Sequence, residues 1–123
     1  METVDDNRIV QLIAALDMDE DPLHMDVTPA ARELGKLGPR VIPHLLGPLG
    51  AQDPMTRLHA QRALEQVLYQ RFGFTPGQGW RQADGEARWR ELWQRNGSYD
   101  FQAPAEARDR AIAAWRQWSA AQE

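Results

Sequence analysis

The chain contains 123 residues, of which 42% are hydrophobic and 26% are charged, and its formal net charge is −4 at pH 7. A chain of this length buries roughly two thirds of its unfolded surface, so residues 1–123 are expected to form one domain without disulfide or metal crosslinks. The absence of cysteine excludes thiol catalysis and cysteine-bound metal centres. The first residues are acidic and lack an apolar run, which predicts a cytoplasmic protein with no membrane association.

Apolar residues at positions i, i+3, i+4 and i+7 predict a first helix, whose apolar stripe is Ile9, Leu12, Ile13 and Leu16. Either Asp5 or Asp6 is expected to be its N-cap. A second helix is predicted with Thr28 as N-cap and Pro29 as its first residue, and Gly38 is expected to end it.

The same spacing recurs in a third predicted helix, whose apolar stripe is Ile42, Leu45, Leu46 and Leu49. Pro48 is expected to end or kink this helix near Gly47, because proline has no backbone N–H. The fourth and longest helix is predicted to have Asp53 as N-cap, to begin at Pro54 and to end at about Phe72.

Glycine and proline interrupt the helical pattern after the fourth helix, which predicts a connecting loop anchored by Phe74 and Trp80. A fifth helix is predicted over about 85–95, and a last one from Pro104 to about Ala120. No segment alternates apolar and polar residues as a half-buried strand does. The sequence therefore predicts an all-α fold.

The first two predicted helices match the next two. Residues 9–16 match 42–49 at an offset of 33, and residues 30–37 match 60–67 at an offset of 30. A repeat of this length made of two helices is typical of α-solenoids, in which each helical hairpin buries its apolar face against a neighbour.

Three stretches within this repeat carry a family resemblance: Leu-Gly-Lys-Leu-Gly at 34–38, Val-Ile-Pro-His-Leu-Leu at 41–46 and Asp-Pro-Met-Thr-Arg-Leu-His-Ala at 53–60. Residues 7–72 thereby resemble two bacterial HEAT-like repeats. The resemblance implies that Asp53 and Arg57 tie adjacent hairpins together. In the first repeat the position of Arg57 is occupied by Val27 and the loop between the helices is longer, so a less regular stack is expected there.

Residues 73–123 contain two tryptophan pairs, Trp89 with Trp93 and Trp115 with Trp118, each after a loop with aromatic and proline residues. This part resembles a tryptophan-rich segment found at the C-terminal end of some HEAT-like bacterial proteins. Large indoles can cover an apolar face while their N–H groups stay at its wet edge. The complete prediction is a short α-solenoid of two HEAT-like hairpins, closed by C-terminal capping helices.

The resemblance implies a non-catalytic protein that binds another protein as a scaffold or adaptor. The polar sides of the second and fourth helices are expected to form the binding surface, with Arg32, Lys36, His59, Arg62 and Gln66 as partner-binding candidates. Self-association through an uncovered end of the solenoid remains an alternative.

Charge supplies a second hypothesis. Residues 1–56 carry 4 basic and 10 acidic side chains, whereas residues 57–123 carry 10 basic and 8 acidic ones. Arginines of the C-terminal third could bind phosphate or nucleic acid, with Arg81, Arg88, Arg90, Arg95 and Arg110 as candidates. The glutamates among them, such as Glu86 and Glu91, disfavour a nucleic-acid backbone.

Motifs for catalysis or cofactors were not found. The acidic stretch 17–26 fails as a calcium loop, because Pro22 replaces the required glycine and Thr28 the final glutamate, although a weaker cation site there stays open. The histidines, His24, His44 and His59, follow no nucleophile motif, and no glycine-rich phosphate loop is present. The sequence therefore predicts no catalytic residues, no cofactor and no metal, unless the chain is a subunit of an enzyme whose catalytic residues lie on a partner.

Overall fold

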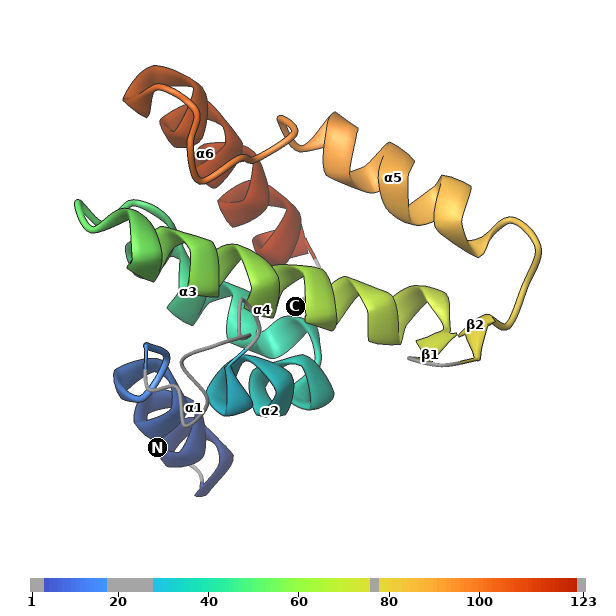
Figure 1. Ribbon diagram of the computed structural model, residues 1–123, viewed down its shortest axis with the longest axis horizontal. Coiled ribbons are helices and arrows are strands. Elements are labelled where there is room, and N and C mark those ends of the chain that lie inside the picture. The colour runs from blue at the N-terminus through green and yellow to red at the C-terminus, as the bar shows by residue number, and fades with distance from the viewer. Residues whose placement is uncertain (1–3, 18–27, 76–77, 122–123) are drawn as a thin grey trace.

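The computed structural model describes residues 4–17, 28–75 and 78–121. The helices of these residues are α1 (Val4–Ala14), α2 (Pro29–Leu37), α3 (Ile42–Leu49), α4 (Pro54–Phe72), α5 (Gly85–Arg95) and α6 (Ala105–Ala121) (Figure 1). A 3-10 turn, η1 (Pro39–Val41), precedes α3, and the short strands β1 (Phe74–Thr75) and β2 (Gly79–Trp80) form an antiparallel hairpin after α4. The predicted all-α class is confirmed.

Local signals fix the ends of α2 and α4 as predicted. Thr28 caps α2 by accepting a hydrogen bond from the backbone N–H of Ala31, and its hydroxyl donates to the carbonyl of Leu16 at 2.8 Å. Asp53 caps α4 by accepting from the N–H of Met55. Gly38 ends α2 with a φ of 87°, a conformation that is costly for residues other than glycine. Each of these helix ends is therefore determined by residues close to it in the sequence.

Three local predictions need correction. Helix α1 begins at Val4, so Asp5 and Asp6 lie within its first turn and not at the N-cap position. Helix α3 ends at Leu49, two residues beyond Gly47, and includes Pro48 in its last turn. The segment after α4 contains a hairpin whose strands have two residues each, which is too short to produce an alternating pattern.

Helix α4 is the centre of the fold, with α2, α3 and α5 packed on it (Figure 1). Helix α1 packs on α2 and α3, and α6 packs on α3. Leu34, Leu45 and Leu64 are fully buried between these helices. A Cβ at Gly35 would lie 2.5 Å from the Cβ of Gln66, so the close approach of α2 to α4 depends on glycine at this position.

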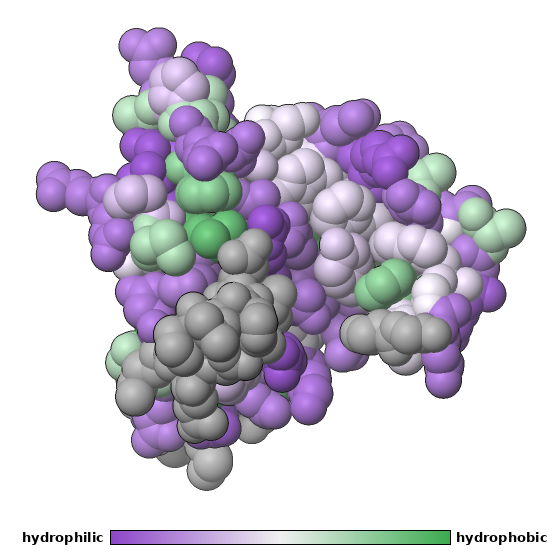
Figure 2. Space-filling view, in the orientation of Figure 1, coloured by the Kyte–Doolittle hydropathy of each residue, from purple (hydrophilic) through white to green (hydrophobic). Residues whose placement is uncertain are grey.

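Aromatic rings fill the space between α4, α5 and α6. Trp115 is fully buried, and its ring lies 5.8 Å from that of Trp93, centroid to centroid. The prediction that the indole N–H groups reach water is wrong for Trp89, Trp93 and Trp115. Nε1 of Trp89 and of Trp115 is buried, without a hydrogen-bond partner in the described part of the chain, and Nε1 of Trp93 donates a buried hydrogen bond to the carbonyl of Tyr99 at 3.2 Å. Figure 2 shows residues of intermediate hydropathy between α4 and α5, and hydrophilic ones along the outer side of α5.

Arg57 joins the loop before α4 to the loop before α6. It is 9% exposed, and its guanidinium donates to the carbonyls of Ala51 and Gln52, each at 2.8 Å, and of Phe101 at 2.9 Å. Near it, the hydroxyl of Tyr99 donates to the carbonyl of Leu49 at 2.6 Å. One buried side chain at the start of α4 therefore couples the loop between α3 and α4 to the loop between α5 and α6.

Candidate functional site

Three of the five predicted partner-binding residues lie in one groove. Arg32 and Lys36 on α2 and Gln66 on α4 line a hollow of about 150 Å³ between the two helices. The remaining lining residues are Gly35, Tyr69, Gln70 and Phe74. We call this hollow the α2–α4 groove. Its rim is basic, and one of its walls is aromatic.

The aromatic wall of the groove is packed against neighbouring rings. The Tyr69 ring stacks on that of Trp89 with a centroid distance of 5.3 Å, and it lies 4.9 Å from the ring of Phe74. Burial raises the pKa of Tyr69 above its ordinary value, with a smaller contribution from the nearby Glu65 carboxylate. The phenol therefore stays neutral at physiological pH and can donate or accept a hydrogen bond.

The rim of the groove is more exposed. Lys36 forms an ion pair with Glu33 one turn earlier at 3.3 Å, and its side chain is 65% exposed. Exposed pairs of this kind contribute little to stability. The ammonium group of Lys36 can therefore leave its ion pair with Glu33 and pair with an acidic group of a ligand.

His59 and Arg62 do not line this groove. His59 is buried, with Nδ1 2.6 Å from a carboxylate oxygen of Asp17, whose second oxygen accepts from the hydroxyl of Thr56 at 2.7 Å. His59 is therefore not on an exposed binding surface as predicted, because Asp17, in the segment that follows α1, lies against it. Arg62 pairs with Glu65 on the same helix at 2.8 Å.

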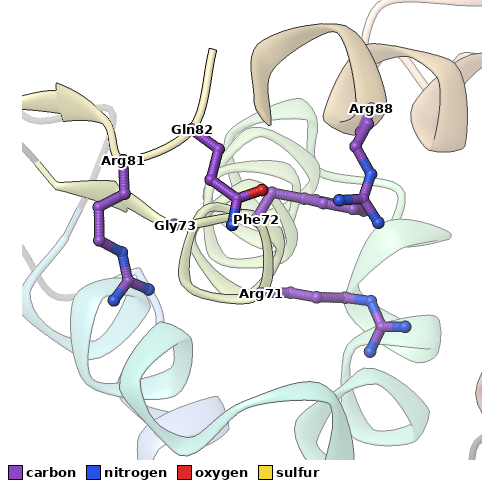
Figure 3. A pocket seen from close by; sticks show the side chains of 6 residues that line it. All are labelled: Arg71, Phe72, Gly73, Arg81, Gln82 and Arg88. Atoms are coloured by element: carbon purple, nitrogen blue, oxygen red, sulfur yellow. The ribbon is translucent and has the colours of Figure 1, made fainter. Parts of the chain in front are cut away.

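A second and larger hollow lies at the C-terminal end of α4. It has a volume of about 570 Å³, and the residues that line it are Arg71, Phe72, Gly73, Arg81, Gln82 and Arg88 (Figure 3). We call it the arginine cleft. Arg81 and Arg88 are two of the predicted phosphate-binding residues, whereas the analysis of the sequence missed Arg71.

Aromatic rings position two of these arginines. The guanidinium carbon of Arg71 lies 5.3 Å from the ring centroid of Trp118 and 6.0 Å from that of Phe72, and that of Arg88 lies 5.7 Å from the Phe72 ring. Figure 3 shows the guanidinium groups of Arg71 and Arg88 on one side of the end of α4, and that of Arg81 on the other. Among the described residues, none of the three arginines forms an ion pair with a carboxylate.

The other predicted phosphate-binding residues lie outside this hollow. Arg90 and Arg95 form exposed ion pairs along α5, with Glu86 at 2.7 Å and Glu91 at 2.6 Å. Arg95 also lines a smaller hollow of about 290 Å³, which adjoins the arginine cleft through their shared residues Arg71, Phe72 and Arg88. Arg110 is exposed and lines neither hollow.

The described residues were also compared with the requirements of a metal site and of a membrane-spanning helix. They contain no group of three or more histidine, aspartate or glutamate side chains able to hold a metal, and apart from Asp17 the acidic stretch 17–26 lies outside them. Within the same residues, every helix is too short or too polar to cross a lipid bilayer. Comparisons with protein-family models, with curated proteins and with solved structures found no match to this chain.

Proposed function

We propose that the protein is a non-catalytic adaptor that holds an acidic segment of another protein in the α2–α4 groove. The observation that carries this proposal is the convergence of Arg32, Lys36 and Gln66, from two helices, on one hollow with an aromatic wall. Guanidinium and ammonium groups suit carboxylates, and aromatic rings suit the apolar parts of a peptide.

The proposal includes a fold assignment: α1 with α2 and α3 with α4 form two HEAT-like hairpins, and α5 and α6 cap them. Packing of α2 on α4 and of α1 on α3 supports this assignment, because stacked hairpins bring equivalent helices together. In such a stack the second helices form a continuous surface, which is where the α2–α4 groove lies.

The composition of the groove favours binding over catalysis. The described residues that line it are arginine, lysine, glutamine, tyrosine, phenylalanine and glycine, and among them there is neither a carboxylate nor an imidazole. General acid–base catalysis near neutral pH draws mainly on those two groups. The close contact of Gly35 with Gln66 also fixes the two walls, so little conformational entropy is lost when a partner binds.

The test of this proposal is charge reversal in the groove. Tagged protein is used to capture partners from nuclease-treated lysate of the source cells, and the bound proteins are identified by mass spectrometry. We expect the wild type to retain a stoichiometric acidic partner and the variant Arg32→Glu/Lys36→Glu to lose at least about nine tenths of it, since both rim charges then repel carboxylates.

The matched control is Arg110→Glu/Arg116→Glu, which makes the same change of charge at two exposed positions of α6. It should capture the partner as the wild type does, and circular dichroism should show equal helicity for all three proteins. Equal capture by the groove variant, or capture that disappears with nuclease, would contradict the proposal.

A further inference from the structure

The arginine cleft carries more positive charge than its surroundings require. Arginines near the C-terminus of α4 complement the helix dipole, but that dipole amounts to only about half a negative charge. Three guanidinium groups from three segments, Arg71, Arg81 and Arg88, line the cleft, and no carboxylate is among the described residues that line it. The excess positive charge calls for an anionic ligand.

Two of the guanidinium groups are oriented before any ligand arrives. Arg71 lies against the rings of Phe72 and Trp118, and Arg88 lies against Phe72. Stacking on a ring occupies the face of a guanidinium and leaves its in-plane N–H groups available as paired donors. Such donors match an oxyanion, and their fixed orientation lowers the entropy lost on binding.

We propose that the arginine cleft binds a small phosphate-bearing molecule, a site independent of the α2–α4 groove. Arg71 and Arg88 donate to one phosphate group, and Arg81 with Gln82 binds the ligand on the other side of the cleft. A phosphate dianion accepts from both stacked guanidinium groups at once. The cleft, at about 570 Å³, also has room for a second phosphate or an organic group.

The surroundings of the cleft select a small ligand over a nucleic acid. Glu86 and Glu91 lie on α5 with Arg88, and both are exposed. A polyanion extending beyond the cleft would approach these carboxylates, and the whole chain carries a net charge of −4. A ligand with its charge confined to the cleft avoids this repulsion.

The experiment is a calorimetric titration of the full chain with pyrophosphate and with inorganic phosphate, at constant ionic strength set by chloride. We expect saturable binding, weakened about tenfold or more in Arg71→Gln and in Arg88→Gln, because each loses a charge-assisted hydrogen bond. Arg110→Gln, the matched control, should change the affinity less than about twofold.

Loss of Arg71 or Arg88, which contact aromatic rings, could disturb folding, so Arg81→Gln is included as a second test. Arg81 contacts no aromatic ring among the described residues. The Arg81→Gln variant should also weaken pyrophosphate binding, and the groove variant Arg32→Glu/Lys36→Glu should not, which separates this site from the adaptor function. No saturable binding, or equal losses in Arg110→Gln, would overturn the proposal. Binding confined to single-stranded oligonucleotides, with an affinity that rises with length and falls steeply with salt, would replace it with a nucleic-acid surface.

Discussion

The region from α1 to α4 and the region from β1 to α6 are stabilised by different kinds of side chain. In the first region, aliphatic residues such as Leu34, Leu45 and Leu64 are fully buried. In the second, aromatic rings form a series with Tyr69 of α4, at centroid distances of 4.9 to 5.8 Å; in order, the rings are Phe74, Tyr69, Trp89, Trp93, Trp115 and Trp118. The aliphatic region spreads its contacts over many small groups, whereas the aromatic region concentrates them in a few large ones.

This difference affects both candidate sites. Tyr69 and Phe74 belong to the aromatic series and also form the wall of the α2–α4 groove. Trp118, at the other end of the series, positions Arg71 in the arginine cleft. The aromatic region therefore supports two binding surfaces as well as the packing of α5 and α6, and substitutions in it test stability and binding together.

The largest effect is expected from Trp115→Ala. The side chain is fully buried, so its loss should lower the free energy of unfolding by about 3–5 kcal/mol, as for other buried aromatic residues. Denaturant unfolding followed by circular dichroism measures this change. Trp118→Ala, at a partly exposed position, should cost less. A loss below about 1 kcal/mol for Trp115→Ala would mean that the aromatic region depends little on this ring.

A smaller effect is expected at the joint between the two regions. Arg57→Met should lower the free energy of unfolding by about 2–3 kcal/mol, because three backbone carbonyls lose a charged donor. Hydrogen exchange should also become faster in the loop between α5 and α6, since one of these carbonyls belongs to Phe101.

The matched control for that joint is Arg90→Met, which breaks an exposed pair with Glu86 and should cost less than about 0.5 kcal/mol. If both variants lost the same stability, or if exchange in the loop stayed at the wild-type rate, Arg57 would not couple the two regions.

The helices could be predicted because their determinants are local. The pairs Thr28-Pro29 and Asp53-Pro54 supply a cap and a first residue within two positions, and both mark the observed starts of α2 and α4. Apolar spacing likewise gave the bounds of α5 and α6 to within about a residue. Each of these features depends on residues less than two helical turns apart.

The candidate sites depend on contacts between distant segments. The spacing of residues along α4 did not indicate a binding role for Arg71. This residue lines the arginine cleft only because the fold places Arg88 of α5 and Trp118 of α6 near it. The burial of His59 has the same origin, since its partner Asp17 follows α1. A helical pattern states which side of a helix is polar, but not which polar side another element will cover.

The hydrogen bond from the Tyr99 hydroxyl to the Leu49 carbonyl also joins the two regions, since Leu49 ends α3 and Tyr99 lies between α5 and α6. Tyr99 is 2% exposed, and burial raises the pKa of its phenol to about 12. Tyr99→Phe leaves the Leu49 carbonyl without this donor, so we expect a loss of about 1–2 kcal/mol in the free energy of unfolding at neutral pH.

The pH dependence of this loss identifies the phenol as its cause. An unfolded tyrosine ionises near pH 10, about two units below the folded one, so unfolding releases a proton between these values and the wild type loses stability as the pH rises through them. Phenylalanine has no such proton, so the stability difference should be constant below about pH 10 and shrink towards pH 12. Urea unfolding of both proteins at neutral pH and near pH 11 measures the change. A difference that stays constant over this range would show that the Tyr99 phenol ionises as readily in the folded chain as in the unfolded one.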